Sequence, residues 1–159
     1  FARRIVVVGT GYVGLTTGAC VASLGHRVVC SDVDAGKVAE LSRGRVRLAE
    51  PGLAELVAEG LAAGRLWFVV GSAAAVADAE VVLVCVPTPM GADGQADVAA
   101  VRAVVAEVGS VLPAGCVVVL KSTVPVGTAA RVRAWLGRSD VAVVSNPEFL
   151  REGSAVADF

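Results

Sequence analysis

The residues with the clearest chemical meaning stand near the start of the chain. Gly9, Gly11 and Gly14 follow the apolar run 5–8 in the pattern G-x-G-x-x-G. Where a strand turns into a helix, the first glycine permits a sharp turn, the second leaves room for a pyrophosphate, and the third lets the helix pack closely on the sheet. The helix N-terminus adds unpaired N–H groups and a partial positive charge. This loop is therefore a predicted dinucleotide-phosphate site. Its predicted contacts are Gly9, Gly11, Tyr12, Val13 and Gly14.

A carboxylate supports this interpretation, because a glycine pattern alone is a weak signal. The second apolar run ends at Asp32, 18 positions beyond Gly14, where an acid can accept hydrogen bonds from the ribose diol of an adenosine. The same carboxylate would repel a 2′-phosphate, and Val33 follows it rather than an arginine. NAD is thus favoured over NADP. The alternative is a glycine-rich turn in a non-binding protein, with Asp32 only capping the next helix.

The elements that must position these residues follow from the apolar pattern. The sequence is 55% hydrophobic but only 4% aromatic, with a mean hydropathy of +0.72. Continuous apolar runs are typical of parallel strands buried on both faces, and strands that alternate with helices predict a Rossmann-type, doubly wound α/β sheet of about six strands with helices on both faces. The expected strands are 4–8, 27–32, 66–70, 80–86, 116–121 and 140–145. The expected helices are 12–24, 34–43, one restarting at 50–53, 72–78, 97–112 and 128–136.

Ligands of such sheets bind beyond the carboxyl ends of the strands, where Thr88, Thr123 and Glu148 each follow an expected strand. The Thr123 hydroxyl could orient a water or a substrate alcohol, or it could satisfy its own backbone in a turn. Glu148 and Glu152 would share one face if 149–152 is helical, and paired carboxylates can do acid–base work. The alternative is that they are solvated or capping charges.

Several other functions are disfavoured. A net charge of −1 gives no footprint for nucleic acid or an anionic membrane. The uncharged run 5–25 is long enough to span a bilayer, but its five glycines and four serine or threonine residues make it poorly apolar, so we expect no membrane span. The only histidine, His26, precedes a strand and is an unsuitable base. No metal site is expected. Trp67 and Trp135 are interpreted as packing residues, as is the ring of Tyr12.

The four cysteines have no C-x-x-C spacing and are interpreted as small buried hydrophobes. The absence of a disulfide framework favours a cytoplasmic protein. Lys37 and the arginines of 43–47 could be a solvated face or could contact cofactor phosphate, and the sequence leaves both possibilities open.

Taken together, the motifs resemble the nucleotide-binding half of the UDP-glucose/GDP-mannose dehydrogenase family. Six stretches in order carry the resemblance across the chain: VVGTGYVGL at 7–15, SDVDAGKVAEL at 31–41, AEPGLAELV at 49–57, VCVPTPMGADGQAD at 84–97, KSTVPVGT at 121–128 and NPEFLREGSAVADF at 146–159. The resemblance implies oxidation of a nucleotide-sugar C6 alcohol to a carboxylate in two steps that reduce two NAD.

The resemblance also implies roles for individual residues. Lys37, Pro87, Thr88 and Thr123 would contact NAD, and Thr123 would also hold a catalytic water and the substrate hydroxyl. Glu148 would act in acid–base steps and contact the substrate. Glu152 would support it as a further catalytic carboxylate. The expected contacts to the nucleotide sugar are Glu148, Phe149, Leu150 and Arg151.

One part of the implied chemistry is missing. The aldehyde step of the family needs a cysteine thiolate, and none of Cys20, Cys30, Cys85 and Cys116 lies in a matching motif. We therefore expect residues 1–146 to form an NAD-binding domain and residues 147–159 to lead toward later domains. The chain alone should bind NAD without completing turnover.

Several alternatives remain open at this point. UDP-glucose is the expected substrate, with GDP-mannose or another nucleotide sugar as alternatives, and the full-length protein is expected to be a homo-oligomer. A hydroxyacid dehydrogenase of the 6-phosphogluconate type is disfavoured by the NPEFLREG stretch. A non-catalytic dinucleotide-sensing module would need neither Thr123 nor Glu148.

Overall fold

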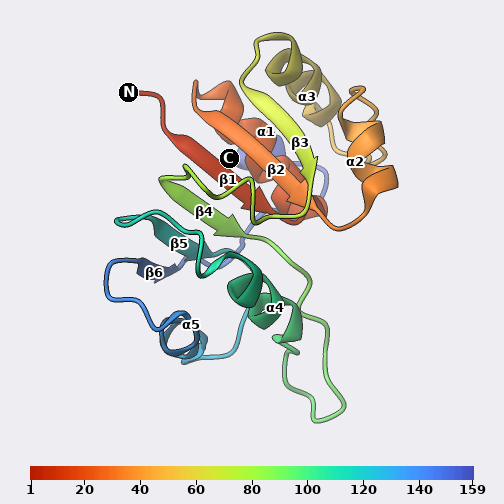
Figure 1. Cartoon of the computed structure of the whole chain (residues 1–159). Helices are drawn as coiled ribbons and strands as arrows, with labels where there is room; N and C mark the ends of the chain where they lie inside the picture. The colour runs from red at the N-terminus through yellow and green to blue at the C-terminus, as the bar shows by residue number, and fades with distance from the viewer.

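The computed structural model describes residues 1–159 and contains one six-stranded sheet in the order β3-β2-β1-β4-β5-β6, in which all neighbouring strands are parallel (Figure 1). The strands are β1 (Arg4–Val8), β2 (Arg27–Asp32), β3 (Leu66–Val70), β4 (Val81–Val84), β5 (Val117–Leu120) and β6 (Ala142–Ser145). This order reverses direction between β1 and β4, where doubly wound sheets bind their ligands. The predicted Rossmann-type α/β fold is confirmed.

Helices cover both faces of the sheet. They are α1 (Tyr12–Ser23), α2 (Ala35–Leu41), α3 (Leu53–Ala62), α4 (Ala99–Val108), α5 (Thr128–Leu136) and the short α6 (Ala155–Asp158). Alternate residues of β1 enter different cores. Ile5 and Val7 pack in a cluster with residues of α1, α2 and α3, whereas Val6 and Val8 pack in a second cluster with residues of α4 and α5. Burial on both faces explains why the central strands are continuously apolar.

The uncharged stretch 5–25 is a strand, a loop and a helix rather than one long helix. Gly18, whose spacing from Gly14 resembles a membrane-helix motif, packs α1 against the sheet: a Cβ there would lie 2.5 Å from Cys30 Sγ. None of the helices combines the length and the apolarity that a membrane crossing requires.

The prediction of a helix at 72–78 is wrong, because these residues form a bend followed by turns. The segment is too short to propagate a helix on its own. Its first two amides are instead held by Glu107, whose Oε1 accepts from Ser72 N at 2.6 Å and from Ala73 N at 3.1 Å. The helix expected at 97–112 is shorter than predicted and forms α4.

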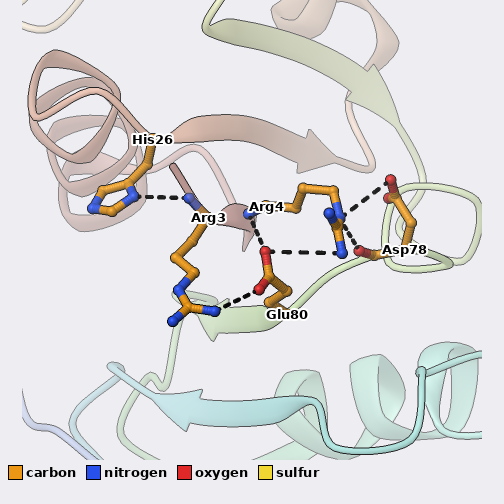
Figure 2. Close-up of polar contacts among 5 residues, drawn as sticks. All are labelled: Arg3, Arg4, His26, Asp78 and Glu80. Carbon is orange, nitrogen blue, oxygen red and sulfur yellow. Dashed lines mark hydrogen bonds and ion pairs between the residues drawn. The ribbon is translucent and has the colours of Figure 1, made fainter. Parts of the chain in front are cut away.

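The amino edge of the sheet carries a polar cluster formed by Arg3, Arg4, His26, Asp78 and Glu80 (Figure 2). Glu80 accepts from Arg3 Nη1 at 2.8 Å and from Arg4 N at 2.9 Å, and Arg4 Nε donates to the Asp78 carbonyl at 2.7 Å. His26 Nδ1 accepts from Arg3 N at 3.1 Å. His26 therefore lies at the edge opposite the strand carboxyl ends, as its sequence position indicates.

Candidate active site at the carboxyl edge of the sheet

The three glycines of the first loop differ in what the fold requires of them. Gly9 has a φ of +97°, and a Cβ there would lie 2.7 Å from the Cys85 carbonyl oxygen. A Cβ on Gly14 would lie 1.8 Å from the Gly9 carbonyl oxygen. Gly11 has an ordinary φ of −68°, and its Cβ would meet nothing within 4 Å. The fold thus explains Gly9 and Gly14, whereas Gly11 keeps open a space above the start of α1.

That space belongs to a cleft of about 610 Å³ along the carboxyl edge. The loops that follow β1, β2, β4, β5 and β6 all contribute to its lining. Ten of the residues predicted from sequence lie in this lining: Gly9, Gly11, Tyr12, Val13, Asp32, Lys37, Pro87, Thr88, Thr123 and Glu148. Gly14 is buried beneath the loop, and Phe149, Leu150, Arg151 and Glu152 lie outside the lining.

Asp32 lies at the end of β2 with its side chain only 13% exposed. Its Oδ2 accepts from Thr10 N at 3.0 Å and from the Thr10 hydroxyl, and Asp34 N donates to Oδ1 at 3.1 Å. Burial opposes ionisation, but these hydrogen bonds and the Lys37 ammonium at 3.4 Å prevail and lower the pKa of Asp32 to about 2. Asp32 is therefore ionised at neutral pH, and Oδ1 retains acceptor capacity for a ribose hydroxyl.

The loops after β4 and β5 are tied together by two hydroxyl groups. Thr88 Oγ1 donates to the Thr123 carbonyl at 2.7 Å, and Ser122 Oγ donates to the Val86 carbonyl at 2.6 Å. The hydroxyls of Thr88 and Ser122 thus form the hydrogen bonds to backbone carbonyls in these loops. The sequence had left open that the Thr123 hydroxyl would form such a bond. The Thr123 side chain is exposed to the cleft and forms no hydrogen bond within the chain. Its hydroxyl is free to bind a ligand or a water.

Glu148 points into the same cleft from the segment after β6. Its Oε1 accepts from Leu150 N, whereas its Oε2 is buried and has no hydrogen-bond donor. The Lys121 ammonium lies 3.4 Å from Oε2 and 3.4 Å from Asn146 Oδ1, and Lys121 and Glu148 are 13% and 11% exposed. This cation was not predicted from sequence, although Lys121 opens one of the quoted motifs. A buried, incompletely bonded carboxylate oxygen at a cleft is a candidate proton acceptor.

Residues 3–159 match a family model described as the NAD-binding domain of the UDP-glucose/GDP-mannose dehydrogenase family. The chain belongs to this family. It is 51% identical to the UDP-glucose 6-dehydrogenase of Pseudomonas aeruginosa, in an alignment that covers 98% of this chain and 36% of that protein.

Solved structures agree with this assignment. The structure of a UDP-glucose dehydrogenase from Pyrobaculum islandicum superposes on this chain with a TM-score of 0.90 at 40% sequence identity. The match covers all of this chain and 39% of the Pyrobaculum chain. The structure of a GDP-mannose dehydrogenase from Pseudomonas aeruginosa gives a TM-score of 0.87 at 33% sequence identity. This match covers 98% of this chain and 38% of that protein's chain. The chain therefore spans little more than a third of these relatives.

The cofactor of this family domain is NAD, and the residues present fit it. The open space over Gly11 would receive the pyrophosphate against the first N–H groups of α1. The ionised Asp32 would hold the adenosine ribose. The next residue, Val33, is 87% exposed and lines the cleft, so no cation stands there for a 2′-phosphate.

Of the basic residues in α2 and in the loop that follows it, only Lys37 is paired with Asp32. Lys37 lines the cleft beside Asp32, whereas Arg45 and Arg47 pair with Glu40 at 3.9 Å and 2.7 Å. These arginines line an adjoining hollow of about 510 Å³ that shares Gly11 and Lys37 with the cleft. Lys37 thus borders both spaces, and it differs from these arginines in being paired with Asp32.

Residues 149–152 of this chain are not helical. Glu148 and Glu152 therefore do not share a helix face, and Glu152 is exposed. Phe149 is 84% exposed, and the Arg151 guanidinium forms two hydrogen bonds to Asp158 at 2.8 Å and 2.7 Å. The Arg151 side chain is thus turned toward α6 and not into the cleft.

Sequence reasoning missed Glu50, which is 6% exposed. Its Oε2 accepts from the Tyr12 hydroxyl at 2.7 Å and from Gly153 N at 2.7 Å, and its Oε1 accepts from Ala155 N at 2.8 Å. Burial and this carboxylate raise the pKa of Tyr12 to about 12. The motif that contains Glu50 was noted, but Tyr12 lies 38 residues before it and Gly153 and Ala155 lie 103 and 105 residues after it, so no local pattern could identify its role.

All four cysteines are buried and free, which confirms their interpretation as small core residues. Cys85 lines the floor of the cleft, where burial raises the pKa of its thiol to about 12. A neutral thiol is a poor nucleophile. Trp67 and Trp135 do not line the cleft; Arg27 lies over Trp67, and Arg102 and Arg131 lie over Trp135.

Proposed function

We propose that this chain is the cofactor-binding part of an enzyme that oxidises the C6 alcohol of UDP-glucose to a carboxylate in two NAD-dependent steps. The observation that carries the proposal is a single cleft that holds both a dinucleotide site and two groups suited to alcohol chemistry that have no hydrogen-bond donor or acceptor within the chain, Thr123 Oγ1 and Glu148 Oε2. Similarity to UDP-glucose dehydrogenases at 51% and 40% identity supports the choice of sugar.

The roles of the chain's own groups follow from their positions. Bound NAD would supply the hydride acceptor. The N–H groups at the start of α1 hold the pyrophosphate, and Asp32 fixes the ribose. Thr123 Oγ1 orients the substrate hydroxyl or a water. Glu148 Oε2 accepts or returns a proton, with the Lys121 ammonium 3.4 Å away keeping the carboxylate in place.

The second oxidation needs a thiolate nucleophile, which the buried thiols of this chain do not supply. We place that group in a part of the enzyme beyond this chain, together with the contacts that distinguish UDP-glucose from GDP-mannose. Residues 1–146 then form the NAD-binding domain, and 147–159 lead toward the substrate. We further propose a homo-oligomeric, cytoplasmic enzyme, in keeping with four free thiols and no disulfide.

Calorimetric titration of the 159-residue chain with NAD, NADP and UDP-glucose tests the cofactor part of the proposal. NAD should bind, NADP should bind much more weakly, and Asp32→Ala should weaken NAD binding about 30-fold, because the charge-assisted hydrogen bond to the ribose is lost. The matched control is Glu59→Gln, which removes an exposed carboxylate on α3. Absence of dinucleotide binding, or nucleotide-sugar oxidation by this chain alone, would contradict the proposal.

A further inference from the structure

We infer that Glu50 is a positioning residue that transmits occupancy of the NAD site to residues 151–155, which lie at the start of the path toward the nucleotide sugar. The inference rests on the proposed function, because it concerns the same cleft and the same substrate segment. It assigns a role to a residue outside the cleft lining.

Glu50 is the one charged side chain among the buried residues of the chain. A buried carboxylate is costly unless hydrogen bonds compensate for its lost hydration. All of its hydrogen-bond donors come from two places, the first residue of α1 and the segment that ends the chain. Tyr12 Oη lies 2.7 Å from Oε2, and Gly153 N and Ala155 N lie 2.7 Å and 2.8 Å from the two carboxylate oxygens.

The terminal segment has few other attachments. α6 is only four residues long, and so short a helix is not stable by itself. The bonds of Arg151 and Ser154 to Asp158 lie within the segment. Outside Glu50, the segment is attached mainly through apolar packing of Ala155 and Val156; the Arg151 carbonyl, 3.1 Å from Tyr12 Oη, shares the single hydroxyl hydrogen that Glu50 accepts. Glu50 and Tyr12 therefore hold the polar backbone of residues 151–155.

Tyr12 connects this anchor to the cofactor site. It is the first residue of α1, and it lines the cleft next to the open space over Gly11. A pyrophosphate bound to the N–H groups of this turn restricts the turn, and Tyr12 Oη then presents a better fixed donor to Glu50. The amides of Gly153 and Ala155 share that carboxylate. Ordering of the first turn of α1 by the cofactor should therefore reduce the entropic cost of ordering residues 151–155. Such coupling is reciprocal.

Amide hydrogen exchange of the 159-residue chain, followed by NMR with and without saturating NAD, tests this coupling. NAD should slow exchange at Gly153 and Ala155 about fivefold or more, the lower end of typical coupling. The reference amide is Gly115 N, which bonds the Asp140 carbonyl at 2.7 Å at the amino edge. It reports any general stabilisation of the domain, and its exchange should slow less.

The test variant is Glu50→Gln, which keeps the size of the side chain but has one oxygen acceptor instead of two. Because the coupling is reciprocal, its NAD affinity should fall by about the same fivefold and no further, since Glu50 lies outside the cleft, while the NAD-dependent slowing at Gly153 and Ala155 is lost. Glu59→Gln, with the same change at an exposed position of α3, should retain the slowing.

The outcomes separate the inference from the proposed function. NAD binding without extra protection of Gly153 and Ala155, or equal protection in Glu50→Gln, overturns the inference alone. Absence of NAD binding overturns the proposed function and the inference with it. If Glu50→Gln does not fold, the parent chain decides by itself: slowing at Gly153 and Ala155 beyond that at Gly115 supports the inference, and equal slowing overturns it.

Discussion

The two edges of the sheet are both polar, but they use their polar groups differently. At the amino edge, Arg3, Arg4, His26 and Glu80 are bonded to one another (Figure 2). At the carboxyl edge, the Thr123 hydroxyl has no partner in the chain and Glu148 Oε2 has no hydrogen-bond donor. Charged residues alone would mark both edges as candidate sites. Groups that line the cleft and retain hydrogen-bonding capacity distinguish the carboxyl edge from this cluster.

The backbone shows the same difference. Gly115, at the turn before β5, has a φ of +81°, a conformation that glycine adopts readily. Gly11 has an ordinary φ and an empty space where a Cβ would lie. A positive φ explains the glycine at position 115. Neither φ nor packing requires glycine at position 11, so Gly11 is the better indicator of a ligand. The comparison of the two edges leads to four predictions.

The largest effect is expected for Glu148→Gln in a full-length enzyme that contains this domain. Removal of a general acid–base group typically costs about 10³-fold in kcat, which steady-state kinetics measures directly. Glu59→Gln, on exposed α3, is the control. Unchanged kcat in Glu148→Gln would favour the dinucleotide-sensing module, in which the carboxyl-edge groups have no catalytic role.

The next largest effect is a difference in folding stability between substitutions at two glycines of the first loop, Gly14 and Gly11. Gly14→Ala should destabilise the chain by about 3 kcal/mol, because its Cβ would lie 1.8 Å from a backbone carbonyl oxygen. Gly11→Ala, with open space at the same atom, should cost less than about 1 kcal/mol and yet weaken NAD binding. Urea unfolding and calorimetry measure the two properties. Equal stabilities would mean that the fold does not distinguish the two glycines.

A smaller effect depends on pH. Because its hydrogen bonds lower the pKa of Asp32 from an ordinary 3.8 to about 2, the unfolded state binds more protons in that range. The stabilisation is therefore complete above pH 3.8 and lost as the pH falls toward 2. The difference in unfolding free energy between the parent chain and Asp32→Asn should shrink on acidification through this window. A difference that stays constant with pH would contradict this.

The smallest effect is expected at the amino edge. Glu80→Gln breaks exposed ion pairs with Arg3 and Arg4, which contribute little in water. NAD affinity should stay within about twofold, as for surface substitutions remote from a site. Calorimetry would detect a larger change, which would show that the two edges are coupled through the sheet.

Much of the fold could be predicted from sequence because its signals are local. The run from Arg4 to Val8, the glycine loop and Asp32 each have a pattern that a short window contains, and the structure places all three as expected. The expected helix at 72–78 failed for the opposite reason. Its conformation depends on Glu107, which is distant in sequence and holds the first two amides.

The same distinction applies to the site. The strand-end rule identified Thr88, Thr123 and Glu148, and all three line one cleft. Which hydroxyl would be free could not be predicted, since Thr88 is engaged by the Thr123 carbonyl across two loops. The ion pair of Lys121 with Glu148 joins the ends of neighbouring strands. Only the assembled sheet brings such groups together.

The strand order also has a consequence for biosynthesis. β1 is the first of these six strands to leave the ribosome, but one of its edges pairs with β4, with Ile5 opposite Val81. Until β4 is synthesised, β1 can pair only with β2, β2 can pair with β3, and the other apolar edge of β1 stays unpaired. An unpaired strand edge is the usual point of misassociation in a nascent chain. Synthesis in this order therefore exposes, for a time, a strand edge that the finished sheet keeps fully paired.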